Sequence, residues 1–161
     1  MLAKELIKIP SVNPPGDEKE VSELLASHME KIGLTVELEE IFPNRSNVIA
    51  TLEGIEGGPT LLFLGHTDVV PVDSGWSIDP FKAIEKEGKL FGRGSADMKG
   101  GLAAMVIAIE SLKRSKVTLR GNLIFAAVID EEVSSYGIRH LIENGLKADY
   151  AIIGEPTDLK M

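Results

Sequence analysis

The segment Leu123–Val133, LIFAAVIDEEV, joins seven consecutive apolar residues directly to three acidic residues. The apolar run has the length and composition of a buried β-strand, and the acids stand where that strand would end. Asp130, Glu131 and Glu132 repel one another, and each loses hydration where it is buried. A cation or a proton nearby offsets both costs. The segment therefore predicts a buried strand that delivers carboxylates to a metal site.

The composition of the whole chain restricts the classes of partner. Of its 161 residues, 43% are hydrophobic and 26% are charged, which is typical of one globular domain. The formal charge of −8 would repel phosphate backbones and anionic lipid surfaces, so neither nucleic acid nor a membrane is an expected partner. No apolar run reaches the ~18 residues of a membrane span, and we expect a cytoplasmic location. Because the chain has no cysteine, a metal would be held by oxygen and imidazole donors.

Helical and strand-like patterns alternate along the chain. Helical spacing predicts helices over residues 1–8, 17–32, 98–113 and 135–144. We expect Asp17 to cap the second of these helices. Strands are predicted over residues 34–40, 47–54, 60–65, 123–129 and 150–154, with a hairpin-like connection at 54–58 and a short hairpin around 82–91. The last three strands are apolar throughout, which indicates burial. The expected fold class is α/β, with a mixed, mostly parallel sheet covered by helices on both faces.

Each of the three most apolar strands leads into a residue that can bind a metal. The first leads into His66, the second into the acids at 130–132, and the third into Glu155. Ligands of open α/β sheets bind at the carboxyl ends of the strands, so these residues can converge on one crevice. Asp97, in the glycine-rich turn GRGSADMKGG, is a fourth candidate. The sequence thus predicts a single site built from four separate segments.

Each candidate also has a structural explanation. His66 and Asp68 are two residues apart, so in an extended segment they face the same way and Asp68 could accept the imidazole N–H. The acids at 131–132 could instead form a turn that caps the next helix, Asp97 could cap the helix that follows it, and Glu155 could be a solvated loop residue. A phosphate-binding loop at the glycine-rich turn is disfavoured, because Asp97 would repel phosphate.

Four strings carry a family resemblance: GHTDVVP (65–71), GRGSADMKGG (92–101), VIDEEVSSYG (128–137) and GEPT (154–157). Their order and spacing resemble the M20 family of metallopeptidases and aminoacylases, and within it the acetylornithine deacetylase and succinyl-diaminopimelate desuccinylase group. By this resemblance His66, Asp97 and Glu155 would coordinate one Zn²⁺ ion. Asp97 would bridge to a second Zn²⁺ ion that Glu132 also binds, and cobalt or manganese could substitute for zinc.

The same resemblance assigns roles to the residues beside the metal ligands. Asp68 would orient His66, and Glu131 would be the general acid and base. A cis peptide bond is implied between Asp97 and Met98. The implied reaction is zinc-dependent hydrolysis of an amide bond in an N-acyl amino acid or small peptide. A carboxypeptidase or dipeptidase of the same family is the alternative.

The resemblance also implies that residues 1–161 are the N-terminal portion of the catalytic domain. The lid and dimerisation domain, the rest of the catalytic domain and a histidine ligand of the second zinc are expected beyond Met161. His28 is expected to be packed and His140 to face water, so neither is expected to replace that histidine. We therefore expect one three-ligand metal position, a second that is under-coordinated, and little activity from this segment alone. The full-length form is expected to be a homodimer.

Two other classes remain open at the level of sequence. A metallophosphoesterase uses the same carboxylate and imidazole ligands, and Arg93 and Lys99 flank Asp97 as candidate partners for a phosphoryl group. A non-catalytic small-molecule binding module of the doubly wound type is the alternative outside enzymes.

Overall fold

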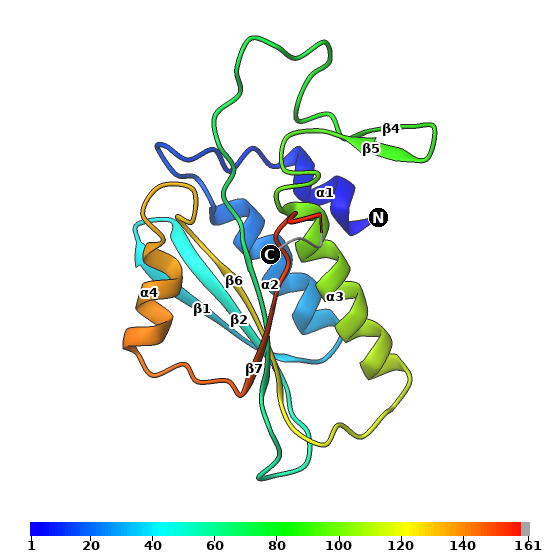
Figure 1. Ribbon diagram of the computed structural model, residues 1–161, viewed down its shortest axis with the longest axis vertical. Coiled ribbons are helices and arrows are strands. Elements are labelled where there is room, and N and C mark those ends of the chain that lie inside the picture. Colours follow the sequence, from blue (N-terminus) through cyan, green and yellow to red (C-terminus); the bar gives the residue numbers. More distant parts are fainter. Residues whose placement is uncertain (159–161) are drawn as a thin grey trace.

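The computed structural model describes residues 1–158 and has a five-stranded mixed sheet at its centre (Figure 1). The order of strands across the sheet is β1-β2-β6-β3-β7. These strands are β1 (Thr35–Phe42), β2 (Arg45–Leu52), β6 (Leu123–Val128), β3 (Leu61–His66) and β7 (Tyr150–Ile153). Strand β2 runs antiparallel to both of its neighbours, whereas β6, β3 and β7 are parallel. The expected mixed α/β sheet is confirmed, and four of its strands point the same way.

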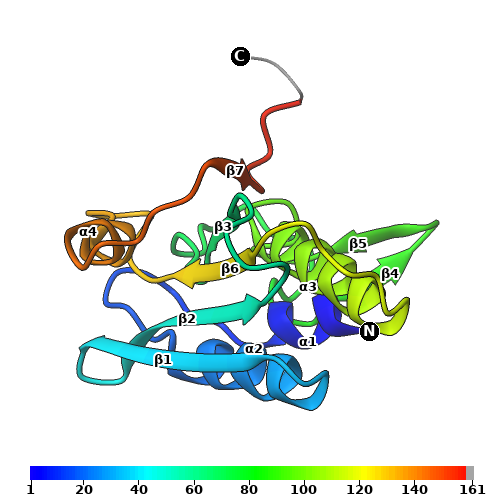
Figure 2. The same ribbon diagram turned by 90° about the horizontal axis from the view of Figure 1, so that it is seen from below.

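Helices lie on both sides of this sheet (Figure 2). The helices are α1 (Leu2–Lys8), α2 (Lys19–Lys31), α3 (Lys99–Arg114) and α4 (Tyr136–Glu143). A separate hairpin is formed by β4 (Ile84–Lys86) and β5 (Lys89–Phe91). The expected cap of α2 is wrong, because Glu18 rather than Asp17 is its N-cap residue. Among residues 1–158, no helix combines the length and the hydrophobicity needed to cross a lipid bilayer.

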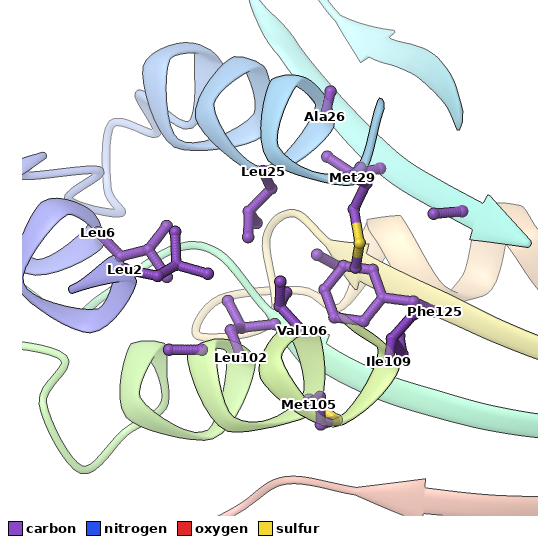
Figure 3. Close-up of a cluster of buried hydrophobic side chains, with 14 of the residues drawn as sticks. Leu2, Leu6, Leu25, Ala26, Met29, Leu102, Met105, Val106, Ile109 and Phe125 are labelled. Carbon is purple, nitrogen blue, oxygen red and sulfur yellow. The ribbon is translucent and has the colours of Figure 1, made fainter. Parts of the chain in front are cut away.

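The larger core fills the space between α1, α2, α3 and one face of the sheet (Figure 3). Phe125 of β6 lies between Met29 of α2 and Ile109 of α3, and all three side chains are fully buried. Full burial of one such side chain contributes roughly 1.5–3 kcal/mol. The apolar spacing that predicts α3 is the same spacing that turns Leu102, Val106 and Ile109 into this core.

A smaller core lies on the other face, where α4 packs against the sheet through Leu141. The expectation that β7 is buried is wrong: Tyr150, Ile152 and Ile153 are each more than half exposed. Strand β7 pairs with β3 along one edge, and within residues 1–158 no strand pairs with its other edge. An apolar run alone does not distinguish this edge position from a central one.

The connection at residues 54–58 is not a hairpin, which corrects the sequence prediction. Strands β2 and β3 are not neighbours, because β6 is inserted between them. The connection instead passes against the segment that leads into β6, and a Cβ atom on Gly58 would lie only 1.7 Å from the carbonyl oxygen of Arg120. Glycine is needed here for a close crossing of two loops rather than for a tight turn.

Candidate metal centre

The carboxyl ends of three parallel neighbours, β6, β3 and β7, lie at the same end of the sheet (Figure 1). His66 is the last residue of β3, and the side chains that follow the two flanking strands reach it. Its Nε2 atom lies 3.5 Å from Oε1 of Glu155 and 3.9 Å from Oε2 of Glu131. The topology of the sheet thus brings together residues that are far apart in the sequence.

Asp97 reaches the same place from the turn before α3. Its Oδ1 atom lies 3.0 Å from Nε2 of His66. Met98 rather than Asp97 is the N-cap residue of α3, and the peptide bond between these two residues is cis. Ligand atoms of His66, Asp97 and Glu132 all lie within 4.8 Å of one another. One imidazole and two carboxylates are therefore close enough to share an ion.

The His66 ring is held in one orientation. It is buried, and its Nδ1 atom lies 2.9 Å from the backbone carbonyl oxygen of Asp68. In the neutral ring Nδ1 therefore carries the hydrogen, and the lone pair of Nε2 faces the carboxylates. We expected the Asp68 carboxylate to accept this hydrogen bond, but its Oδ1 atom is 3.5 Å away and the backbone oxygen is the nearer acceptor.

The Asp68 carboxylate is occupied by other donors. Asn13 donates to it through Nδ2 at 2.8 Å, and the backbone N–H groups of Glu131 and Glu132 donate at 3.1 Å and 3.2 Å. Asp68 therefore lies beside His66 and also fixes the backbone of residues 130–132, which we call the acidic turn. The N–H groups of the turn are not visible in the side-chain pattern of the sequence, which is why sequence reasoning missed this role.

The electrostatics of the centre favour positive charge. Burial opposes protonation of His66, but the carboxylates of Asp68, Glu155 and Asp97 outweigh it and raise the pKa of His66 to about 9. Burial raises the pKa of Glu132 and of Glu155, and the nearby charge of Asp97 adds to both shifts. The proton on His66 thus offsets part of the negative charge of the nearby carboxylates in the metal-free chain.

The residues present fit a divalent metal ion. The donors are carboxylate oxygens and one imidazole nitrogen, which zinc, cobalt and manganese accept. The ring tautomer leaves the Nε2 lone pair available as a ligand, and the charge of Asp97, which adds to the raised pKa of Glu132 and of Glu155, is one that a divalent cation would offset.

A cavity of about 360 Å³ opens beside these residues. His66, Glu131 and Glu155 line one part of it, and apolar side chains line the rest. Those apolar residues include Leu64, Val128, Ile138 and Ile153. The cavity has the size of a small-molecule site and combines a polar, titratable region with an apolar wall.

The side chains of the two basic residues that flank Asp97 in the sequence point away from the metal centre and bind backbone oxygens. Lys99 is fully buried and donates to the backbone oxygen of Ile9, and burial lowers its pKa to about 7. Arg93 donates to the backbone oxygen of Pro71 and lies over the ring of Trp76, with its Cζ atom 5.4 Å from the ring centroid. Among residues 1–158, neither cation makes a hydrogen bond to a carboxylate of the centre.

The two remaining histidines lie outside the cluster. His28 Nε2 is 3.5 Å from a carboxylate oxygen of Glu110, and the side chain is half-buried, in line with the expected packed position. His140, which was expected to face water, has a side chain that is 36% exposed, and its Nε2 atom lies 2.9 Å from Oε1 of Glu39 on β1.

Comparison with known proteins identifies a family that this chain matches. The family described as Peptidase family M20/M25/M40 matches residues 62–161. The N-formyl-4-amino-5-aminomethyl-2-methylpyrimidine deformylase of Bacillus subtilis is 35% identical over 163 residues, covering 98% of this chain and 38% of that protein. The acetylornithine deacetylase of Vibrio campbellii is 44% identical over 155 residues, covering 94% of this chain and 40% of that protein.

A solved structure is similar over the same region. The M20 family metallo-carboxypeptidase Sso-CP2 from Sulfolobus solfataricus superposes with a TM-score of 0.83 at 32% identity. The match covers 94% of this chain and 36% of that one. The chain therefore spans about two fifths of the length of the curated relatives that it matches.

Proposed function

The chain belongs to peptidase family M20/M25/M40, and from this premise we propose that it contributes the metal centre of an amidohydrolase that cleaves an N-acyl amino acid or small peptide. The observation that carries the proposal is that ligand atoms of His66, Asp97 and Glu132 lie within 4.8 Å of one another, while Oε1 of Glu155 lies 3.5 Å from Nε2 of His66. We further propose that residues 1–161 are the N-terminal portion of a longer catalytic domain, which the coverage of the relatives supports.

The proposed ligands divide between two positions. His66, Asp97 and Glu155 would hold one Zn²⁺ ion, and Asp97 and Glu132 would hold a second, whose set of ligands is incomplete within residues 1–161. When bound, zinc polarises an amide carbonyl and lowers the pKa of a water molecule. The hydrogen bond from Nδ1 of His66 to Asp68 supports this assignment, because it keeps Nε2 available.

Glu131 is the proposed general acid and base. Its side chain is 44% exposed and lines the cavity, and its backbone is fixed by the Asp68 carboxylate. From there it takes a proton from the attacking water and returns it to the departing amine. Asp68 contributes by position, since it orients the ring of His66 and the backbone of Glu131.

The substrate is proposed to be an N-acyl amino acid. Two relatives are named as a deacetylase and a deformylase, and both names denote removal of an acyl group. A carboxypeptidase or dipeptidase of the same family is the second candidate, which the similarity to a metallo-carboxypeptidase favours. A phosphoesterase is disfavoured because Lys99 and Arg93 are engaged by backbone oxygens.

The test is an assay of the full-length form on N-acetyl, N-succinyl and N-formyl amino acids, on dipeptides and on a phosphate ester. We expect zinc-dependent release of the amine from an N-acyl amino acid, loss of activity with a chelator, and recovery with zinc. Hydrolysis of the phosphate ester alone, or no hydrolysis by a zinc-loaded full-length form, would overturn the proposal. We also propose a homodimeric, cytoplasmic full-length form, and sedimentation and fractionation would test these two points.

A further inference from the structure

A buried polar network connects the acidic turn to residues that do not touch the metal centre. Asn13 donates through Nδ2 to Oδ2 of Asp68 at 2.8 Å and to Oδ1 of Asp130 at 2.9 Å. The same Oδ1 atom of Asp130 accepts a hydrogen bond from Nη2 of Arg45 at 3.0 Å. Arg45 also makes two hydrogen bonds to Glu18, at 2.7 Å and 2.6 Å. Asn13 and Arg45 therefore both hold Asp130, from two directions.

Asn13 is a neutral bridge between two buried carboxylates. Asn13, Asp68 and Asp130 are each less than 5% exposed, so an unpaired charge at this point would be costly. The amide has two N–H groups, and each is given to a different acid. The main chain fixes the amide in place, because the N–H group of Asn13 donates to the carbonyl oxygen of Val69 at 2.9 Å.

Arg45 supplies the only positive charge that the described residues bring to Asp130 by a salt bridge. The pairing with Glu18 is two-pronged, which fixes the plane of the guanidinium group. Glu18 is fully buried, and the Arg45 side chain is 13% exposed. The guanidinium therefore reaches Asp130 from a rigid anchor at the start of α2.

Asn13 and Arg45 hold Asp130 at a point where the backbone has an unusual conformation. Its φ angle is +61°, a left-handed conformation that non-glycine residues rarely adopt. Asp130 stands two residues after the end of β6, and the next two N–H groups, those of Glu131 and Glu132, both donate to the Asp68 carboxylate. The same backbone turn sends the Glu131 and Glu132 side chains toward His66.

We propose that Asn13 and Arg45 are positioning residues, which hold the Asp130 turn so that Glu131 and Glu132 stay at the metal centre. The expected effect on metal binding rests on the proposed function. The effect on the backbone of the turn does not, because it is a property of the metal-free chain. Among the described residues, neither side chain makes a hydrogen bond to a proposed ligand of the ion. They act through Asp130, and Asn13 acts through Asp68 as well.

The first measurement is amide hydrogen exchange of Glu131 and Glu132 in the metal-free chain, followed by NMR. The variants are Asn13→Leu, which removes both donors, and Asn13→Ser, which keeps one and is the milder change. Arg45→Met removes the positive charge. Arg45→Lys keeps the charge but lacks the planar guanidinium group that pairs with Glu18 at two points. Asn122→Leu and the exposed Arg139→Met are matched controls outside the network. We expect exchange at these two amides to rise at least tenfold in Asn13→Leu and Arg45→Met, and less in Asn13→Ser and Arg45→Lys.

The second measurement is titration of the same variants with Zn²⁺ and with Co²⁺, whose absorption spectrum reports ligand geometry. We expect a loss in metal affinity of about 10- to 100-fold in Asn13→Leu, as for residues that orient metal ligands. We also expect an altered Co²⁺ spectrum in this variant and partial recovery in Asn13→Ser. Unchanged exchange at Glu131 and Glu132 in folded Asn13→Ser and Arg45→Met would overturn the inference. A wild-type chain that protects these amides but binds no zinc would overturn the proposed function and leave the positioning intact.

Discussion

Nε2 of His66 lies 3.5 Å from Oε1 of Glu155, and the two residues are placed by adjacent parallel strands. Leu64 of β3 pairs with Ile153 of β7, and His66 and Glu155 each stand two residues beyond this pair. A buried imidazole and a partly buried carboxylate at this distance require a shared proton or a cation.

The two glutamates of the acidic turn should differ in function. Glu131→Gln in the full-length form is expected to lower kcat by about 10²- to 10⁴-fold, because it removes the group that transfers the proton. Its metal content should stay unchanged. Glu132→Gln is the matched control, and it should lose metal from the second position. Metal analysis after dialysis checks both variants, and loss of metal in Glu131→Gln instead would show that the two roles are exchanged.

The protonation of His66 should make its contribution to stability depend on pH. Its pKa in the folded chain is raised to about 9 from 6.5, so the folded state binds the proton more tightly than the unfolded state. The stabilisation is complete below pH 6.5 and is lost as the pH rises through 9. The free energy of unfolding should therefore differ most between the metal-free wild type and His66→Gln at pH 6, and least above pH 9.

Urea unfolding of both chains in a chelator measures this difference. The comparison is needed because Lys99, whose pKa burial lowers to about 7, acts in the opposite direction between pH 7 and 10.5. Lys99 is present in both chains, so its effect cancels in the difference. A gap between wild type and His66→Gln that stays constant from pH 6 to 10 would contradict the raised pKa.

Gly101 should matter for the position of Glu155. A Cβ atom at Gly101 would lie 2.7 Å from the backbone oxygen of Gly154, so Gly101→Ala must displace the segment that carries Glu155. We expect zinc affinity to fall several-fold while α3 remains folded, since alanine favours a helix by about 1 kcal/mol over glycine. Gly75→Ala is the control, because its nearest neighbour is Oδ1 of Asp73 at 3.5 Å. Equal zinc affinity in the two variants would contradict this placement.

Phe125 should be a main determinant of stability. It is fully buried between α2, α3 and the sheet, so Phe125→Ala is expected to lower the free energy of unfolding by about 3–5 kcal/mol. Phe91 is 42% exposed, and Phe91→Ala should cost less than about 1 kcal/mol. Chemical denaturation of the two variants checks the contrast. A loss of similar size at both positions would show that the core is not where the structure places it.

The sequence predicts the parts of the site that local pattern controls. The runs that end at His66, at the acids after Val128 and at Glu155 are recognisable because an apolar strand and its following ligand are contiguous. The helix after Asp97 is recognisable from its apolar spacing. The family motifs add the order of these parts and the cis peptide bond at Asp97.

Long-range pairing is what the sequence does not reveal. The insertion of β6 between β2 and β3, and the exposure of Ile152 on an edge strand, depend on which strands pair, and local periodicity does not encode this. Asn13 stands in a turn-rich segment with no hydrophobic pattern, and its bridge to Asp130 spans 117 positions of sequence. The hydrogen bond from His66 to a backbone oxygen, rather than to the Asp68 side chain, is equally invisible at the level of residue types.

Calorimetric titration of the metal-free chain with Zn²⁺ tests the central claim most directly, with His66→Ala measured alongside. The proposed ligands predict one tightly bound zinc ion in the wild type, weak or undetectable occupancy of the second position, and loss of the tight binding in His66→Ala. Zinc binding that is absent from the folded wild type, or that is equally tight in His66→Ala, would contradict the claim that His66, Asp97, Glu132 and Glu155 form a metal centre.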